Sequence, residues 1–150
     1  MLRIGTILAI ILSLVCTSCL APEVAEMATI EGAEWHKEAY VEVANSDTLS
    51  LRNLAIAVRT NSNFRESKLP LKIETLTPDG RSFAEECHLP IRVGRSAIVA
   101  QSIALPYRED VCLAQRGKYI FVLTPLAPIK GVEAVGVTVS DIKDDNNGKR

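Results

Sequence analysis

From Trp35 onward, the sequence consists of short runs rich in β-branched and aromatic residues, each ended by proline, glycine or polar residues. No run has the sustained three-to-four-residue period of an amphipathic helix. Around Val41 and Leu71, apolar side chains occupy every second position, which is typical of strands with one buried face. The pattern therefore predicts an all-β fold, an antiparallel two-sheet β-sandwich of immunoglobulin-like or jelly-roll type, in one domain.

We expect strands near residues 39–43, 49–60, 69–73, 83–91, 97–105, 119–124 and 132–139. The sequence Thr-Pro-Asp-Gly at 77–80 predicts a hairpin turn, because proline presets φ, aspartate bonds nearby backbone and glycine accepts positive φ. Within 49–60 the apolar positions change from odd to even, which predicts a β-bulge or short break near Arg52. Pro106 is expected to end its strand. Residues 119–124 are apolar on both faces, which predicts a central strand covered on both sides.

The first 18 residues have the features of a bacterial signal peptide: Arg3 is followed by an apolar run over 4–15 and then by small or weakly polar residues. This run is about twelve residues long, whereas a helix needs roughly twenty to span a bilayer. Ser18 precedes Cys19 as in the lipobox of bacterial lipoproteins, so we expect acylation at Cys19. Cys16 is a weaker acceptor because the bulky Val15 precedes it, and an ordinary secretory peptide cut nearby is the alternative.

Cleavage before Cys19 would leave a lipidated tether over 19–33, a β-sandwich domain over 34–142 and a disordered polar tail over 143–150. Cys87 and Cys112 then remain as an even pair, which in an oxidising compartment suggests a possible disulfide. Two buried apolar thiols are the alternative. The strand pattern places Phe83 and Cys87 on one inward face, with Glu85 as the polar exception.

The remaining residues give little indication of catalysis. The net charge of −1 predicts no field that would gather nucleic acid, so we expect no nucleic-acid partner. His36 and His88 lie in no metal-ligand spacing, and no nucleophile elbow or glycine-rich phosphate loop is present. We therefore expect no enzyme, no catalytic residues, no cofactor and no metal. The candidates for exposed rings are Trp35, Tyr40, Phe64 and Tyr107, most of which we expect in the core.

Several motifs follow one another in a recognisable order. After the lipobox come an isolated tryptophan, Leu-Ala-Ile-Ala-Val-Arg-Thr at 54–60, a polar loop around Phe64 and Leu-Pro-Leu-Lys-Ile at 69–73. Near the end lie Gly-Lys-Tyr-Ile-Phe at 117–121 and Ile-Lys-Gly-Val-Glu-Ala-Val-Gly-Val at 129–137. Their order and spacing resemble the gliding-motility lipoprotein GldH family of the Bacteroidetes over residues 19–140. The chain differs from the family pattern in having Phe64 where tyrosine is usual and in carrying Cys87 and Cys112.

The resemblance implies a lipid-anchored protein of the cell envelope, at the outer membrane on either its periplasmic or its surface face. It implies a structural or protein-interaction role in the gliding-motility apparatus, which is linked to type IX secretion. The partners would be the lipid bilayer, through acylated Cys19, and other envelope gliding or secretion proteins. The family supplies no catalytic residues.

Two functions remain open, and the surface distinguishes them. Sandwich loops often carry function, so Phe64 and the turn around Tyr107 and Arg108 are the expected partner contacts. The alternative is an outer-membrane lipoprotein that binds glycan or another small ligand. A row of exposed aromatic rings on one sheet would favour the alternative, whereas a bare hydrophobic patch or an exposed edge strand would favour protein contact.

Overall fold

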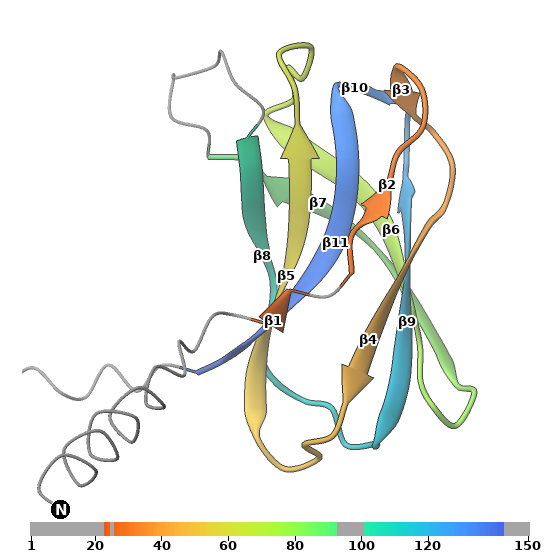
Figure 1. Cartoon of the computed structure of the whole chain (residues 1–150), viewed down its shortest axis with the longest axis vertical. Coiled ribbons are helices and arrows are strands. Elements are labelled where there is room, and N and C mark those ends of the chain that lie inside the picture. Colours follow the sequence, from red (N-terminus) through yellow and green to blue (C-terminus); the bar gives the residue numbers. More distant parts are fainter. Residues whose placement is uncertain (1–22, 25, 93–100, 143–150) are drawn as a thin grey trace, which may run out of the picture.

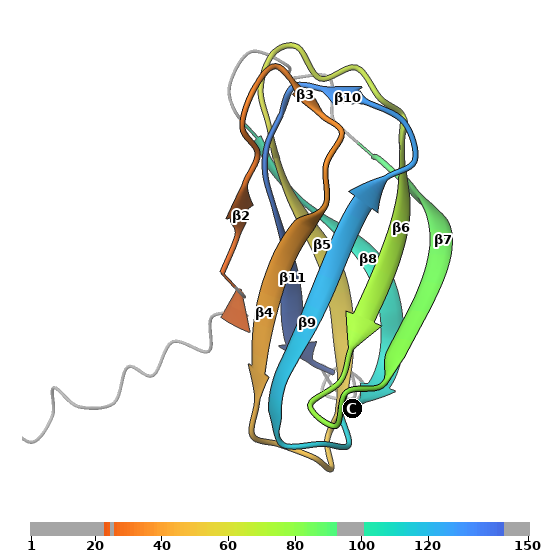
Figure 2. The same ribbon diagram turned by 90° about the vertical axis from the view of Figure 1, so that its right-hand side faces the viewer.

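The computed structural model describes residues 23–24, 26–92 and 101–142, and over these residues the chain forms two large sheets packed face to face and one two-stranded sheet (Figures 1 and 2). Every strand pairing is antiparallel. The predicted class, an all-β antiparallel sandwich, is confirmed. None of the described segments forms a helix long and apolar enough to cross a membrane. Cys16, Cys19 and the predicted tail over 143–150 lie outside the described residues.

Each sheet has a continuous strand order. The first sheet consists of β1 (Glu23–Val24) and β2 (Ala28–Thr29), which both pair with β11 (Val132–Asp141), followed by β5 (Leu51–Thr60) and β8 (Gln101–Cys112). The second has the order β4 (Ala39–Asn45), β9 (Gly117–Pro125), β6 (Lys68–Leu76) and β7 (Ser82–Pro90). The short strands β3 (Glu34–Trp35) and β10 (Ile129–Lys130) pair with each other.

The strand order decides between the two predicted topologies. β1 and β2 pair with β11 in registers that differ by one residue, so they act as one edge strand. An immunoglobulin sandwich keeps its last two strands as neighbours in one sheet. Here β11 pairs with β5, and β9 lies in the other sheet between β4 and β6. With β1/β2 as the first long strand and β3 and β10 left out, the orders are 1-8-3-6 and 2-7-4-5. This is a jelly-roll arrangement.

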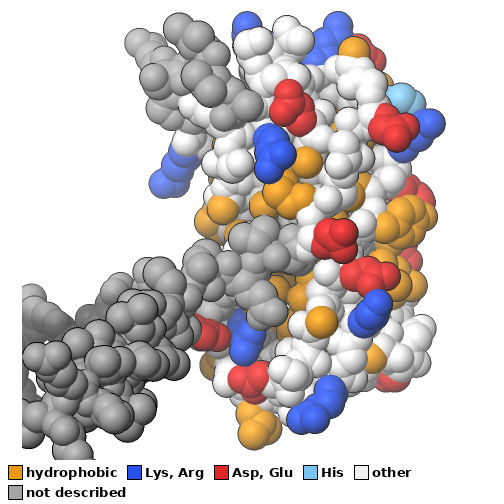
Figure 3. Space-filling view, in the orientation of Figure 1, with side chains coloured by type: hydrophobic (Ala, Val, Ile, Leu, Met, Phe, Trp, Pro, Cys, Tyr) orange, Lys and Arg blue, Asp and Glu red, His pale blue; other side chains and the backbone are white. Residues whose placement is uncertain are grey.

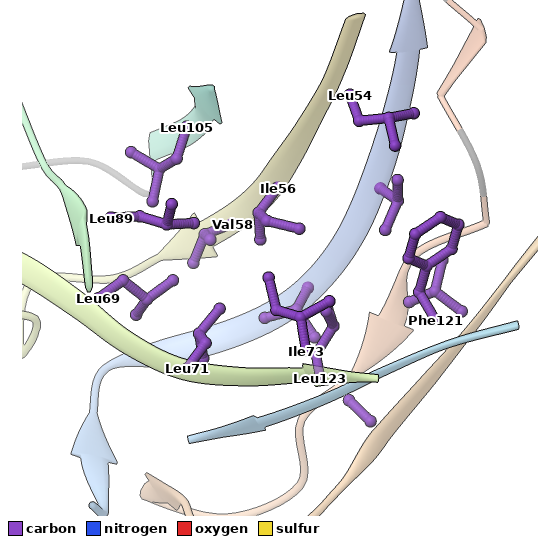
Figure 4. Packing of buried hydrophobic residues seen from close by; sticks show 14 of the residues in the cluster. Leu54, Ile56, Val58, Leu69, Leu71, Ile73, Leu89, Leu105, Phe121 and Leu123 are labelled. Atoms are coloured by element: carbon purple, nitrogen blue, oxygen red, sulfur yellow. The ribbon is translucent and has the colours of Figure 1, made fainter. Parts of the chain in front are cut away.

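The hydrophobic core lies between the facing sides of the sheets (Figure 4). The predicted alternation of apolar and polar residues is confirmed in β4 and at the start of β6, where Val41 and Leu71 are almost inaccessible. Trp35 is also buried, and its Nε1–H donates to the Lys37 carbonyl at 2.7 Å. Side chains from four strands make up much of the remaining core: Ile56, Val58, Ile73, Phe121, Leu123, Val135 and Val137.

The hairpin predicted at 77–80 connects β6 and β7. The Thr77 N–H donates to the Arg81 carbonyl at 2.9 Å, and Gly80 has a φ of +83°. The two-sided cover predicted for 119–124 holds for Val122, which is 6% exposed, but Ile120 is only half-buried. β9 is nevertheless a central strand of its sheet.

The predicted bulge in 49–60 lies on the neighbouring strand instead. β5 pairs with β11 without a shift from Arg52 to Arg59. On its other side, β5 pairs with β8, and here Arg52 lies opposite Val111 and Ala55 opposite Pro106. An advance of three residues along β5 therefore corresponds to five residues along β8. The extra residues therefore belong to β8. Leu51 points away from the core and is 50% exposed, which explains the change of apolar phase without a bulge in β5.

Two predicted boundaries also differ from the structure. Pro106 does not end its strand, because β8 continues to Cys112. β8 forms a sheet edge, where a residue without an N–H is tolerated. The predicted tether over 19–33 contains β1 and β2, and the Ile30 N–H donates to the Glu133 carbonyl at 2.8 Å. Among the described residues, strand pairing is therefore already present at Glu23, well before Trp35.

Candidate functional site

The two sheets separate along the side of the sandwich where β7 and β8 lie. Within the described part of the chain, β7 pairs only with β6 and β8 only with β5, so both are sheet edges. Between them lies a largely apolar cleft of about 330 Å³. Its lining includes Phe83, Glu85, Tyr107, Arg108, Val111 and Phe121.

The extra residues of β8 shape this cleft. Tyr107 is one of them, since it falls between the pairs Leu54–Arg108 and Ala55–Pro106. A bulge bends its strand and re-aims the side chains near it, and here both Tyr107 and Arg108 line the cleft. In the second irregularity, Asp110 has a φ of +55°, and its N–H donates to the Asn53 side-chain oxygen at 3.2 Å.

A cluster of three polar side chains connects the two edges. The Glu85 carboxylate accepts hydrogen bonds from the Tyr107 hydroxyl and from Arg108, through Nη2 at 2.6 Å and Nε at 3.1 Å. The Arg108 guanidinium carbon also lies 5.7 Å from the centre of the Tyr107 ring, within cation–π range. Because the Glu85–Arg108 pair is half-exposed, its contribution to stability is about 1 kcal/mol or less. Its geometric effect is to hold one polar wall of the cleft in place.

The charge states in this cluster follow from its hydrogen bonds. The hydroxyl of Tyr107, and then Arg108, lower the pKa of Glu85 below its ordinary value. Burial, together with the hydrogen bond to Glu85, raises the pKa of Tyr107 to about 12. At neutral pH a charged carboxylate therefore accepts from a neutral phenol and a guanidinium. The arrangement offers an apolar hollow with one charged wall, which suits the binding of an apolar side chain.

The structure places the predicted contact residues in two separate regions. Tyr107 and Arg108 lie within β8 and not on a turn, because the strand continues past Pro106. Phe64 lies in the β5–β6 connection beyond Thr60, half-buried against the core. Tyr107 and Arg108 therefore belong to the cleft, and Phe64 does not.

Phe83 is a site residue that the sequence pattern assigned to the core. The predicted face is correct, since Leu89 on the same side of β7 is buried, but Phe83 itself is 58% exposed. It lies where the sheets separate, so no residue of the opposite sheet covers it fully. Glu85, on the same face, was the available signal, because a carboxylate there indicates that this end of the face is accessible to water.

Cys87 and Cys112 are both free thiols, and the possible disulfide is not formed. Glu85, two residues before Cys87, contacts Tyr107. Tyr107 precedes Cys112 by five residues on β8, so this contact between the two strands lies away from Cys112. The alternative of two buried thiols also fails, because Cys112 is exposed and Cys87 is half-buried.

A thiol titration tests this arrangement. In protein without its signal peptide and with Cys19→Ser, we expect both Cys87 and Cys112 to react under denaturing, non-reducing conditions. In the folded domain Cys112 should react first, by on the order of tenfold, because burial raises the pKa of the Cys87 thiol. Cys112→Ser should remove the fast phase. Protein in which neither thiol reacts would contradict the structure.

A second hollow, of about 390 Å³, lies beside β2, β3 and the start of β4. Its polar residues are largely paired: Tyr40 donates to Glu38 at 2.5 Å, and Lys130 Nζ lies 3.4 Å from Glu34. His36 is exposed beside Glu34. Over residues 23–24, 26–92 and 101–142, no group of three or more histidine, cysteine, aspartate or glutamate side chains is placed to hold a metal ion.

The fold and the cleft together define a jelly-roll β-sandwich with one open side. No protein-family model matches the chain, and no curated protein matches it. Among solved structures, the chain is similar to a family GH115 4-O-methyl-α-glucuronidase with specificity for decorated arabinogalactans, at 16% identity and a TM-score of 0.33. The match covers 81% of this chain and 17% of that enzyme. At this TM-score the likeness carries no argument about function.

Proposed function

We propose that this chain is a membrane-anchored lipoprotein of the cell envelope that works through protein contact. Its place is that of a structural or interaction component of the gliding-motility apparatus linked to type IX secretion. The assignment to this apparatus rests on the resemblance of the sequence motifs to the GldH family. The mode of action rests on one structural observation, the apolar cleft between the edge strands β7 and β8, beside which Phe83 is 58% exposed.

The edges explain what kind of partner would fit. An edge strand presents unpaired backbone N–H and C=O groups, and an extended segment of another protein can add to it as a further strand. A bulky apolar side chain of that segment would then enter the cleft and pack against Phe83. Aromatic anchors of this kind contribute much of the binding energy at protein interfaces. The partner is therefore an extended segment of an envelope protein with at least one large apolar residue.

The exposed aromatic rings give less support to glycan binding. Tyr40 and Phe83 are the most exposed rings among the described residues, at 61% and 58%. Tyr40 lies on the outer face of β4, whereas Phe83 lies on the inner face of β7 at the opposite side of the same sheet. The two rings thus form no row on one face, as a platform for sugar rings would require.

Phe83→Ser in the full-length lipoprotein should reduce crosslinking to its envelope partner by about tenfold or more, since a lost anchor side chain costs on the order of 2 kcal/mol. Tyr40→Ser is the matched control, because it removes an equally exposed ring outside the cleft. Both variants should keep the wild-type Tm. The measurement is quantitative mass spectrometry of crosslinked complexes from native envelopes.

Two results would contradict the proposal. In one, the Phe83→Ser variant gives as much crosslinked complex as the Tyr40→Ser control. In the other, the purified domain binds an envelope polysaccharide and Phe83→Ser abolishes that binding, which would favour the glycan function instead.

A further inference from the structure

One end of the sandwich exposes a group of hydrophobic side chains. We call this group the apolar tip; it consists of Leu49, Leu51 and Ile142, which are 88%, 50% and 37% exposed. Leu49 lies in the turn between β4 and β5. β11 pairs with β5 in a register that sets Asp141 opposite Arg52. One residue further in the same register, Ile142 lies beside Leu51. Figure 3 shows hydrophobic side chains at the lower end of the molecule, where Figure 1 places this turn.

The turn holds Leu49 outward through hydrogen bonds. Asp47 Oδ1 accepts from the backbone N–H of Leu49 at 3.0 Å and of Ser50 at 3.1 Å. Asp47 also pairs with Arg52, whose Nε lies 3.5 Å from Asp141. Arg52 therefore balances one of the two carboxylates beside the apolar tip, and these three charged groups together carry a net charge of −1.

The first strand fixes the direction from which the chain enters the domain. Glu23 pairs with Val139, which in turn pairs with Leu54. Because β1 is antiparallel to β11, the chain enters from the end where β11 finishes, which is the end that carries the apolar tip. From the level of Leu54 to Leu51 there are three residues, roughly 10 Å of strand.

The number of residues before Glu23 matches this distance. Cys19 precedes Glu23 by four residues, which extend to at most about 14 Å. An acyl group on Cys19 thus lies within reach of the level of Leu51. The other end of β5, at Thr60, is six residues beyond Leu54, roughly 20 Å further away. Of the two ends of the sandwich, the one with the apolar tip is therefore the end within reach of the membrane that holds the lipid.

We propose that the apolar tip rests in the interface of the bilayer that carries the acyl chains of Cys19. This inference rests on the proposed lipid anchor and adds a fixed orientation of the domain. Transfer of leucine and isoleucine side chains from water to the acyl boundary lowers the free energy. A lipid anchor also keeps these side chains at a high effective concentration at the membrane. The strands then stand on the membrane with the edges of β7 and β8 open at the side.

Tryptophan fluorescence on tethered protein tests this seating. Trp35 is the single tryptophan and is 1% exposed, so its emission is a constant background, and subtracting the parent spectrum gives the emission of an added indole. Protein without its signal peptide, carrying Cys87→Ser and Cys112→Ser, is coupled through the Cys19 thiol to maleimide lipid in phosphatidylcholine vesicles. Leu49→Trp should shift its emission to the blue and be quenched by brominated phosphatidylcholine. Leu126→Trp is the matched control, because Leu126 is an exposed leucine just beyond β9 at the other end.

A second measurement uses the same protein without the tether. The variant with Leu49→Asp and Leu51→Asp should partition onto phosphatidylcholine vesicles about a hundredfold less than the parent, at roughly tenfold for each leucine. Leu126→Asp should leave the partition coefficient unchanged. Both leucines of the tip are exposed, so circular dichroism should show a folded variant.

Three outcomes would overturn the proposal. The first is an emission maximum of tethered Leu49→Trp protein that is typical of an indole in water. The second is equal quenching of Leu49→Trp and Leu126→Trp by the brominated lipid. The third is a blue-shifted emission of Leu49→Trp in the absence of vesicles, in protein that has the mass of a dimer. Because the tether is chemical, these results do not depend on acylation in the cell. Separately, wild-type protein that takes up no palmitate label would contradict the lipoprotein proposal.

Discussion

Replacing Gly131 with alanine should lower the free energy of unfolding by about 3 kcal/mol or more. Gly131 has a φ of +77°, in the left-handed region, where a Cβ is unfavourable by roughly 1–2 kcal/mol. The added Cβ would also lie 2.3 Å from the backbone nitrogen of Phe64 and 2.7 Å from the carbonyl carbon of Asn63. These are backbone atoms, so no side-chain rotation relieves the overlap. The Asn61 N–H donates to the Gly131 carbonyl at 2.9 Å, which holds the two segments together.

Gly80→Ala is the matched control for this variant. Gly80 has a similar φ of +83°, but no atom lies within 4 Å of the position where its Cβ would be built. Its substitution should therefore cost only the conformational part, roughly 1–2 kcal/mol. Urea denaturation of the two variants measures the difference, which reports the backbone contact alone. Equal losses of stability would show that the β5–β6 connection does not pack on Gly131 as described.

Local patterns in the sequence predicted the elements whose signals are local. The alternation around Val41 and Leu71 identified strands and their buried faces, since a residue period of two is set by the strand itself. The hairpin at 77–80 followed from the φ preferences of proline and glycine. The close contact at Gly131 did not follow in the same way, because it depends on Asn63 and Phe64, which are distant in the sequence.

The cleft was only partly predictable, because it depends on which strands form sheet edges. Pairing partners are set by long-range packing, and no local pattern identified β7 and β8 as edges. Pro106 suggested the end of a strand, whereas at an edge it is compatible with a strand that continues. Tyr107 and Arg108 were thus identified as contact residues for a different reason, as members of a turn. Phe83 was placed in the core because it shares a face of β7 with Cys87 and Leu89, although Glu85 interrupts that apolar face.

The largest effect on localisation should come from Cys19→Ala in the full-length protein. We expect loss of palmitate labelling and transfer from the membrane fraction to the soluble envelope fraction. The apolar run over 4–15 is about twelve residues long and too short to span a bilayer, so it provides no substitute anchor. A bacterial lipid anchor with two or more acyl chains is effectively permanent, whereas a few exposed leucines bind reversibly. The apolar tip alone should therefore not retain the protein.

Cys16→Ala is the matched control, because it removes the neighbouring thiol and leaves Ser18 and Cys19 in place. It should keep both labelling and membrane retention. Labelled Cys19→Ala protein together with unlabelled Cys16→Ala protein would show that the acceptor is Cys16. If unlabelled Cys19→Ala protein stayed on the membrane and Leu49→Asp then released it, the apolar tip would be a stronger anchor than three exposed side chains predict. That result would show that the folded domain, and not the acyl group on Cys19, holds the protein on the membrane.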